Sequence, residues 1–339
     1  MASSEYTSTG IPGGPEVRTF GRLYQTVPDS VNDFQILSEK FASLRSSANG
    51  HRRIVMRALS PNEILNEAIA SDLPVEAVIP MSFVTGHDSS IIFFGENFHP
   101  SPRQGTDIVL NTTIEKKPLE KIESVIKKGF TLSNKLIESD RENLFNLWNR
   151  FGWTIEGIVD FINKIHSGEK NLWFSGVRDQ TGQLVSASQA EAIEFAGIKY
   201  IETTEYSTLD GFEKLGLCTA SVEALIAQLL QETYYANNAV NTLLPVITAE
   251  FNTSSTSSAV GANAGFIIPK QGGIPQILSY NVAVVDGSPP NQVAFEQWED
   301  EKEIPLRFLR DFAVAVLPRE NIENLYPPDV VNKIISLYN

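Results

Sequence analysis

The apolar and polar residues change their period within the stretch from Lys199 to Leu230. Tyr200 to Thr208 consists mostly of β-branched, aromatic and small polar residues, which is typical of a strand. A turn that contains Gly211 and Gly216 follows, and apolar residues then recur three and four positions apart, which predicts an amphipathic helix. These apolar positions are Val222, Leu225, Ile226, Leu229 and Leu230.

A strand that enters a helix through a glycine turn forms a potential anion site. The first N–H groups of a helix have no partner within the helix, and the helix dipole favours negative charge there. The turn is therefore a candidate site for a phosphate, and an ordinary strand-to-helix connection without a ligand is the alternative. Gly211 and Gly216 alone do not decide between the two.

The residues from Lys127 onward predict the order β-α-α-β-β-β-α-β-α-β-β. Strands are indicated by runs of β-branched and large apolar residues between turn residues, and helices by apolar residues at helical spacing. The predicted strands lie at 130–132, 171–178, 184–195, 198–209, 245–252, 276–285 and 292–298. The predicted helices lie at 143–151, at 154–165, in the central segment after Gly216 and within the small-residue segment 254–265.

Composition and pattern divide the chain into four parts. Residues 1–16 are rich in Ser, Thr, Gly and Pro, which predicts a disordered tail. Residues 17–125 mix predicted strands and helices and indicate a smaller N-terminal α/β domain. Residues 126–300 contain most of the regular order described above. In 301–339, apolar residues at helical spacing predict a C-terminal helical extension, which we interpret as a packing or oligomer element that is compatible with a homodimer.

The composition limits the class of function. Of the 339 residues, 42% are apolar, which is enough for a substantial core, but no apolar run is long enough to span a membrane. The formal net charge of −14 argues against a nucleic-acid-binding protein, which needs a basic surface. The single cysteine, Cys218, fits a reducing, cytoplasmic compartment. The four histidines lack the spacing of a metal site, so we expect no metal.

The order of elements around the glycine turn resembles the GNAT superfamily of N-acetyltransferases. These enzymes hold the pyrophosphate of acetyl-CoA on backbone N–H groups of a Q/R-x-x-G-x-G/A turn at a helix start. The matching residues here are Glu213, Lys214, Leu215, Gly216, Leu217 and Cys218. The resemblance implies an α/β protein with the mixed α+β sheet of the GNAT-like acyltransferase fold. It also implies acetyl-CoA as co-substrate and a small-molecule amine as acceptor.

The turn departs from the superfamily pattern at its first position, where Glu213 stands in place of Arg or Gln. A carboxylate 4 Å from a phosphate charge is repelled by about 1 kcal/mol in bulk water, and by more where solvent is excluded. Binding of acetyl-CoA therefore requires that Glu213 turn outward and that Lys214 face the phosphates.

Within the superfamily, the chain looks most like the β-lysine N-acetyltransferase branch, over about residues 70–300. The segment 200–217 is similar to a branch segment such as NAEMTDFATLPEYRGKGL. Ser257–Asn263 is similar to a small-residue stretch that ends in G-M-N, and this likeness places Asn263 in the cofactor site. Val75–Pro80 resembles an E-A-x-I-P stretch, and Ser279–Val282 resembles an asparagine-rich strand of that branch.

Formation of an amide from a thioester requires a deprotonated amine, and a carboxylate can take that proton. Glu202 lies eleven residues before Glu213, the offset at which histone-acetylating members of the superfamily carry their general base. Glu202 and Glu205 face opposite sides of a regular strand, so both line one side only if the strand has a bulge near Glu205. The alternative is that both are solvated residues paired with Lys199 or Lys214.

The resemblance also implies groups for the remaining steps. If the strand and its neighbour diverge, the backbone N–H groups of Tyr206, Ser207 and Thr208 supply donors to the thioester oxygen. The superfamily usually carries a tyrosine in the helix after the position of Asn263, which protonates the leaving thiolate. The residues 264–268 contain no hydroxyl group, and Tyr280 is our candidate to replace that tyrosine.

Together these observations predict an N-acetyltransferase that transfers an acetyl group from acetyl-CoA to a primary amine of a small, amino-acid-like molecule. Two alternatives remain open. The chain is compatible with a non-catalytic binding or scaffold protein that has kept the fold and lost acetyl-CoA binding. It is also compatible with an acyltransferase that uses another carrier, such as acyl carrier protein.

Overall fold

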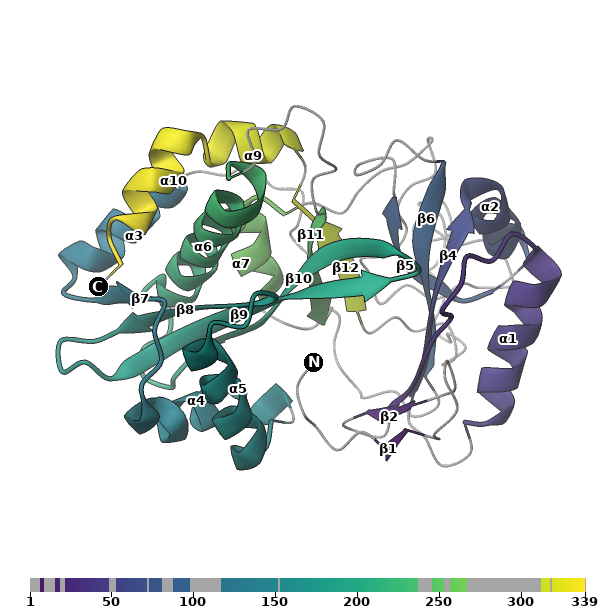
Figure 1. The fold of residues 1–339 in the computed structure, drawn as a ribbon, viewed down its shortest axis with the longest axis horizontal. Coiled ribbons are helices and arrows are strands. Elements are labelled where there is room, and N and C mark those ends of the chain that lie inside the picture. The colour runs from purple at the N-terminus through teal and green to yellow at the C-terminus, as the bar shows by residue number, and fades with distance from the viewer. Residues whose placement is uncertain are drawn as a thin grey trace, which may run out of the picture.

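The computed structural model contains two β-sheets, each of which carries helices (Figure 1). The structure describes residues 7–8, 16–18, 22–48, 53–71, 73–80, 88–97, 117–151, 153–236, 246–252, 257–266, 312–317 and 319–338.

The first sheet has the strand order β1-β2-β3-β4-β6-β5. Its strands are β1 (Thr7–Ser8), β2 (Glu16–Arg18), β3 (Arg22–Thr26), β4 (Arg53–Pro61), β5 (Val75–Pro80) and β6 (Ser89–Asn97). The helices are α1 (Phe34–Ser46) and α2 (Asn62–Ala70). β3 and β4 are parallel and are connected through α1, whose first turn is capped by the Asp33 side chain. The strands β1 and β2 begin within the segment that the composition predicts to be a disordered tail.

The second sheet has the order β12-β11-β10-β9-β8-β7, and among its neighbouring pairs only β10 and β11 are parallel. Its strands are β7 (Thr131–Ser133), β8 (Leu172–Arg178), β9 (Leu184–Phe195), β10 (Ile198–Thr208), β11 (Val246–Asn252) and β12 (Phe312–Val316). The helices are α3 (Pro118–Lys127), α4 (Arg141–Trp148), α5 (Ile155–Ser167), α6 (Leu217–Leu229), α7 (Ser257–Ala264), α9 (Arg319–Leu325) and α10 (Pro328–Ile335). Three shorter turns are η3 (Glu138–Asp140), η4 (Asn149–Phe151) and the π-helical η5 (Leu230–Tyr234).

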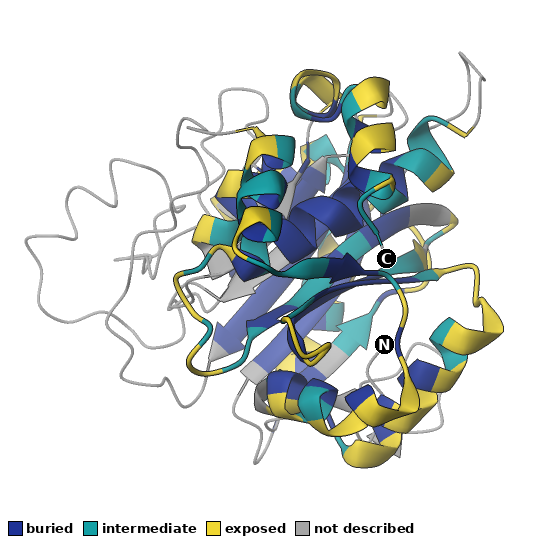
Figure 2. Ribbon diagram, turned by 90° about the vertical axis from the view of Figure 1, so that its left-hand side faces the viewer, coloured by how far each residue is buried: buried dark blue, intermediate teal, exposed yellow. Residues whose placement is uncertain are grey.

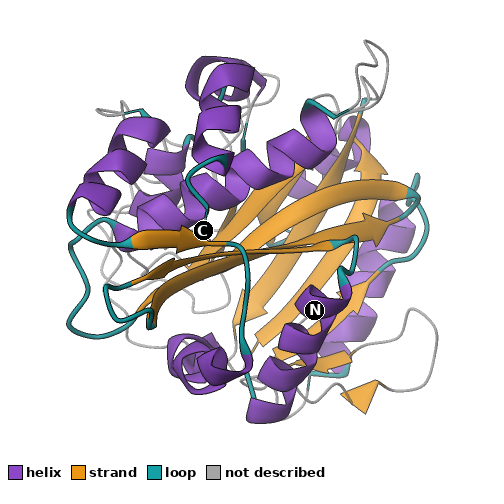
Figure 3. Ribbon diagram, turned by 60° about the vertical axis from the view of Figure 1, so that its left-hand side comes forward, coloured by secondary structure: helices purple, strands orange, loops and turns teal. Residues whose placement is uncertain are grey.

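Helices cover both faces of the second sheet (Figure 3). On one side, which we call the α6 face, α6 packs on β8 and β9 and is itself covered by α3, α7 and α10. Almost every residue of α6 is therefore buried, as the dark blue helix in Figure 2 shows. On the other side, the α4/α5 face, a cluster of aromatic and aliphatic residues from α4 and α5 packs against Phe174 and Ala187 of the sheet.

The structure confirms the mixed α/β class and the predicted order from β7 to α7. The segment 312–316 is a correction, because its apolar residues were interpreted as part of a helix and they form β12 instead. A short apolar run does not distinguish a strand from a buried helix, and here pairing with the edge of β11 decides the outcome. α9 and α10 confirm helices within 319–335, and residues 301–311 of the predicted C-terminal extension lie outside the described residues. The strands predicted at 276–285 and 292–298 lie outside the described residues.

The two sheets contact each other along their edge strands β5 and β12, which lie side by side in Figure 1. A second contact joins the buried Arg57 of β4 to β10, because its guanidinium donates a hydrogen bond to the hydroxyl of Tyr200. The guanidinium carbon also lies 5.8 Å from the ring centre of Phe93 and 5.9 Å from that of Tyr200. The first sheet is therefore attached to the strand that precedes the glycine turn.

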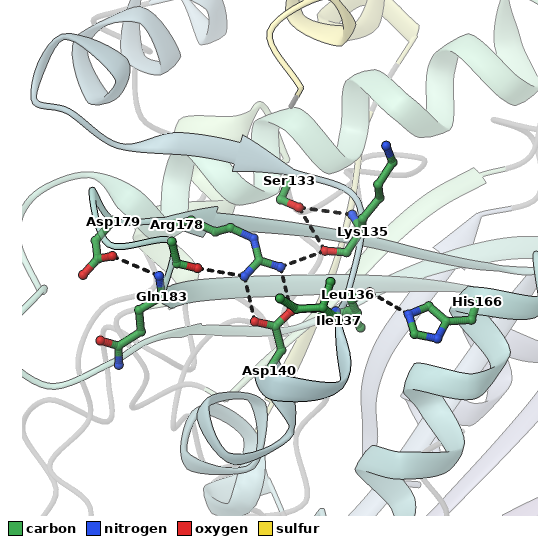
Figure 4. A network of polar contacts seen from close by, with 10 residues as sticks. Ser133, Lys135, Leu136, Ile137, Asp140, His166, Arg178, Asp179 and Gln183 are labelled. Carbon is green, nitrogen blue, oxygen red and sulfur yellow. Dashed lines mark hydrogen bonds and ion pairs between the residues drawn. The ribbon is translucent and has the colours of Figure 1, made fainter.

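A buried ion pair connects β8 to the segment before α4. Figure 4 shows the guanidinium of Arg178 facing the carboxylate of Asp140, with donor–acceptor distances of 2.7 and 2.6 Å. Arg178 also donates to the carbonyl oxygens of Lys135 and Gly182, and the N–H of Ile137 donates to Asp140. These bonds satisfy both charged groups and fix the entry to the α4/α5 layer.

We expect Asp140→Asn to lower the free energy of unfolding by about 3–5 kcal/mol, because it leaves the guanidinium of Arg178 buried without a counter-charge. Urea unfolding followed by circular dichroism measures the change. Glu323→Gln, which breaks the exposed pair with Arg319 on α9, is the control and is expected to change stability little. A loss no larger than that of the control would contradict the assigned role.

Candidate functional site

The strands β10 and β11 part in the middle of the second sheet. Their parallel ladder runs from the pair Tyr200–Val246 to the pair Thr203–Ala249, although both strands continue beyond it. From Thr248 onward β11 pairs with β12 on its other side. The hydroxyl of Thr203 donates to the carbonyl oxygen of Thr248 at 2.9 Å and marks the vertex of the opening.

A bulge lies in β10 directly after this vertex. Thr204 is opposite Gln189 on β9, but the next registered pair is Ser207 with Ala187, so two residues of β10 face one residue of β9. The first of the two, Glu205, has a φ of 59°, a left-handed conformation that non-glycine residues adopt at a cost of about 1–2 kcal/mol. The structure thus confirms the bulge that the two carboxylates required.

The bulge brings Glu202 and Glu205 to the same side of the sheet. Ile201 belongs to the core under α6, and the hydroxyl of Thr203 lies 2.5 Å from that of Tyr206 in the same core. Strand alternation therefore directs the intervening Glu202 to the α4/α5 face. Glu205 lies there as well, because one of its carboxylate oxygens accepts a hydrogen bond from the indole of Trp153 at 3.0 Å.

Two tryptophans hold the bulge in place. Trp148 of α4 donates its indole N–H to the backbone oxygen of Glu205 at 3.0 Å, and Trp153 donates to the side chain of the same residue. The two indole rings lie 5.1 Å apart and belong to the core beneath α4 and α5. The strained residue is thus stabilised through both its backbone and its side chain.

Tyr206, Ser207 and Thr208, which were predicted to supply backbone donors, follow the bulge in β10. Tyr206 is buried on the α6 face, and burial raises the pKa of its phenol, so the hydroxyl stays protonated. The hydroxyl of Ser207 donates to the carbonyl oxygen of Leu147 in α4. Because the N–H of Leu209 donates to β9, the N–H of Thr208, one residue earlier, points away from β9 and toward the side from which β11 has departed.

The turn between β10 and α6 has three residues with left-handed φ angles: Gly211 at 86°, Lys214 at 62° and Gly216 at 84°. Gly216 is the N-cap of α6, and the first turn of that helix contains no acidic residue. A side chain at Gly216 would force the backbone into an unfavourable conformation, which explains glycine at the N-cap.

Glu213 and Lys128 set the charge at this turn. The carboxylate of Glu213 folds back and accepts a hydrogen bond from the N–H of Gly211 at 2.7 Å, on the exposed outside of the turn. Lys128, which follows α3, donates to the carbonyl oxygen of Leu215 at 2.9 Å. A cation that the sequence pattern did not identify is thus fixed next to the N-terminus of α6.

The other predicted cofactor residues are less closely grouped. Leu217 is buried in the core, and Cys218 is partly buried. The side-chain amide of Asn263 on α7 donates to the backbone oxygen of Ala259 in the same helix. The backbone oxygen of Asn263 accepts a hydrogen bond from Lys121 of α3. Tyr280 lies outside the described residues, so its predicted role is not tested.

The described part of the chain contains no group of three His, Cys, Asp or Glu side chains arranged to hold a metal ion. Among the same residues, no helix combines the length and apolar character needed to cross a membrane. Sequence reasoning missed Lys128, Trp148 and Trp153 as contributors to the site, and no motif or spacing marks them.

Comparison with known proteins gives only weak matches. No family model matches the sequence, and no curated protein matches it. A glucosamine-6-phosphate N-acetyltransferase from Arabidopsis thaliana is 15% identical with a TM-score of 0.26, over 30% of this chain and 75% of its own. A spermidine N-acetyltransferase chimera from Vibrio cholerae is 14% identical with a TM-score of 0.34, over 57% and 98%. A GNAT family acetyltransferase of Staphylococcus aureus is 15% identical with a TM-score of 0.24, over 33% and 88%.

The second sheet has three antiparallel strands, a turn and helix after the third, and a parallel strand that separates from it, which is the order predicted from the sequence.

A buried carboxyl group on α6 forms an ion pair with a lysine of α3. Glu223 is fully buried on α6, with one oxygen 2.8 Å from the ammonium of Lys121 and the other without a hydrogen-bond partner among the described residues. Burial raises the pKa of Glu223 to about 8, and Lys121 only partly opposes this. Lys121 bonds both α6 and the end of α7, so the group joins α3, α6 and α7.

We expect stability to depend on pH through Glu223. Its pKa is higher in the folded chain than in the unfolded chain, where it is about 4.5, so the folded state binds the proton more tightly. The contribution of Glu223 to the free energy of unfolding is therefore fully present below about pH 4.5 and is lost as the pH rises through about 8. Glu223→Gln should flatten this part of the curve in urea titrations, whereas Glu67→Gln, at an exposed position of α2, should not. Parallel curves for wild type and Glu223→Gln would contradict the assignment.

Proposed function

We propose that the protein is an N-acetyltransferase that transfers an acetyl group from acetyl-CoA to a primary amine of a small molecule. The observation that carries the proposal is the parting of β10 from β11 after Thr203, directly before a glycine turn at the N-terminus of α6. An opening in a sheet next to a helix N-terminus offers a thioester carrier two things at once. It provides a place between strands for an extended chain and backbone donors for its phosphates.

The turn residues fit a pyrophosphate. The amides from Lys214 to Cys218 would provide donors at the start of α6, and Lys128 and Lys214 would provide positive charge. The repulsion expected from Glu213 is reduced, because its carboxylate is directed back to Gly211 on the solvent side. Asn263 remains a proposed contact at the end of α7.

The acceptor would approach from the α4/α5 face. Glu202 would accept a proton from the ammonium group, which frees the nitrogen lone pair for attack on the thioester carbon. The N–H groups of Thr208 and Tyr206 would stabilise negative charge on the thioester oxygen, whereas that of Ser207, two residues before Leu209, points to β9. The C–N bond then forms, the C–S bond breaks, and the departing sulfur takes a proton, for which Tyr280 remains our candidate donor.

A non-catalytic protein with the same fold is the second candidate. It is favoured by the hydrogen bond between Gly211 and Glu213, which uses one amide of the turn, and by the bonding of the Asn263 side chain within its own helix. An acyltransferase with another carrier would share the acceptor chemistry and differ at the turn.

Calorimetry with CoA and acetyl-CoA separates these candidates. We expect micromolar binding, and we expect Lys128→Met to weaken it by about threefold to tenfold, an effect that decreases at high salt. Lys127→Met is the matched control, because Lys127 is the preceding residue, is exposed and makes no bond to the turn. No binding of either compound up to millimolar concentration would reject acetyl-CoA as the co-substrate.

We expect Glu202→Gln to lower kcat by about 10²- to 10⁴-fold and to leave the affinity for CoA unchanged, because the amide cannot accept the proton. Product formation from a panel of amines with acetyl-CoA, followed by mass spectrometry, provides the measurement. Glu194→Gln on the neighbouring strand β9 is the control and should retain turnover. Unchanged turnover in Glu202→Gln would remove this residue from the mechanism.

A further inference from the structure

A buried amide on β9 lacks a hydrogen-bond partner next to the proposed acceptor site. Gln189 is only 2% exposed, and its side-chain oxygen makes no hydrogen bond among the described residues. It is paired with Phe174 on β8 and with Thr204 on β10. Because Phe174 belongs to the core beneath α4 and α5, Gln189 also points to the α4/α5 face.

Three carboxylates share this face with Gln189. Glu191 lies two residues along the same strand and is directly opposite Glu202 on β10. Glu205 is brought to the same face by the bulge, between Thr204 and the segment opposite Ala187. The amide oxygen of Gln189 thus lies in a row of groups that accept hydrogen bonds.

The physical chemistry of this row favours a bound cation. A buried carbonyl oxygen without a donor is unfavourable, and two carboxylates opposite each other on adjacent strands repel. An alkylammonium group has three donors and no acceptor, so it satisfies the amide oxygen and reduces the repulsion at the same time. A neutral hydroxyl group would supply a donor without the charge.

We propose that Gln189 is a binding residue for the ammonium group of a protonated alkylamine, together with Glu202 and Glu205. The proposal rests on the proposed function only in giving that amine the role of acetyl acceptor. The bound amine is positioned by the carbonyl oxygen of Gln189 next to Glu202, on the side of β10 opposite the core of α6.

The test is titration calorimetry of the full chain with 1,4-diaminobutane, without coenzyme and again with saturating CoA. The wild type should bind the diamine and not 1,4-butanediol, which has the same length without charge. Gln189→Leu should raise the dissociation constant of the diamine at least about tenfold, because a hydrogen bond to a charged group is lost. Gln189→Met, which is unbranched like glutamine, should give the same loss.

Stability separates this role from a structural one. Because the oxygen of Gln189 has no partner, Gln189→Leu should keep or raise the urea midpoint, whereas a structural glutamine would lose stability on this change. Gln228→Leu is the matched control. Its oxygen is also buried without a partner among the described residues, but α6 lies on the opposite face of the sheet, so the change should leave diamine binding unaltered.

The outcomes distinguish this proposal from the proposed function. Diamine binding that falls in Gln189→Leu supports the ammonium site even if no acetyl product forms. Product formation with an unchanged Michaelis constant for the amine in both Gln189 variants overturns the ammonium site and leaves the transferase intact. Absence of diamine binding to the wild type in both titrations, or equal binding of the diol, also overturns it.

Discussion

The ladder between β10 and β11 ends at Thr203, and the arrangement of the site depends on this end. Up to that residue the two strands are paired, and beyond it β11 remains paired only with β12 on its other edge. The hydroxyl of Thr203 bonds the carbonyl oxygen of Thr248 across the vertex, so the opening begins at a fixed point. The glycine turn and the N-terminus of α6 follow after the end of β10 at Thr208.

The bulge after the vertex determines on which face of the sheet Glu205 lies. An unbulged β10 would place Glu205 under α6, where a carboxylate would be buried in an apolar core. The left-handed residue moves it to the α4/α5 face, and the indoles of Trp148 and Trp153 compensate the strain. Glu205 thus lies at the shift in register, has the strained backbone and supplies a carboxylate.

The sequence predicted much of this arrangement and failed where packing decides. The order of elements follows from local periodicity, and the bulge followed from the requirement that Glu202 and Glu205 act on one side. The residues 312–316 were assigned to a helix because the apolar residues of the C-terminal segment lie at helical spacing, and their pairing with β11 makes them a strand instead. Gln189 and Lys128 were missed because their importance arises from registers and contacts between distant segments, which no spacing reveals.

The contact of Arg57 with Tyr200 connects the first sheet to the strand that carries Glu202. Tyr200 lies two residues before Glu202 on the same strand and on the same face, so Arg57 connects β4 to the strand that carries the carboxylate. The guanidinium is buried and lies against the aromatic rings of Phe93 and Tyr200, which leaves little freedom for sliding. The first sheet is therefore tied to β10 by a buried, charged hydrogen bond two residues before Glu202.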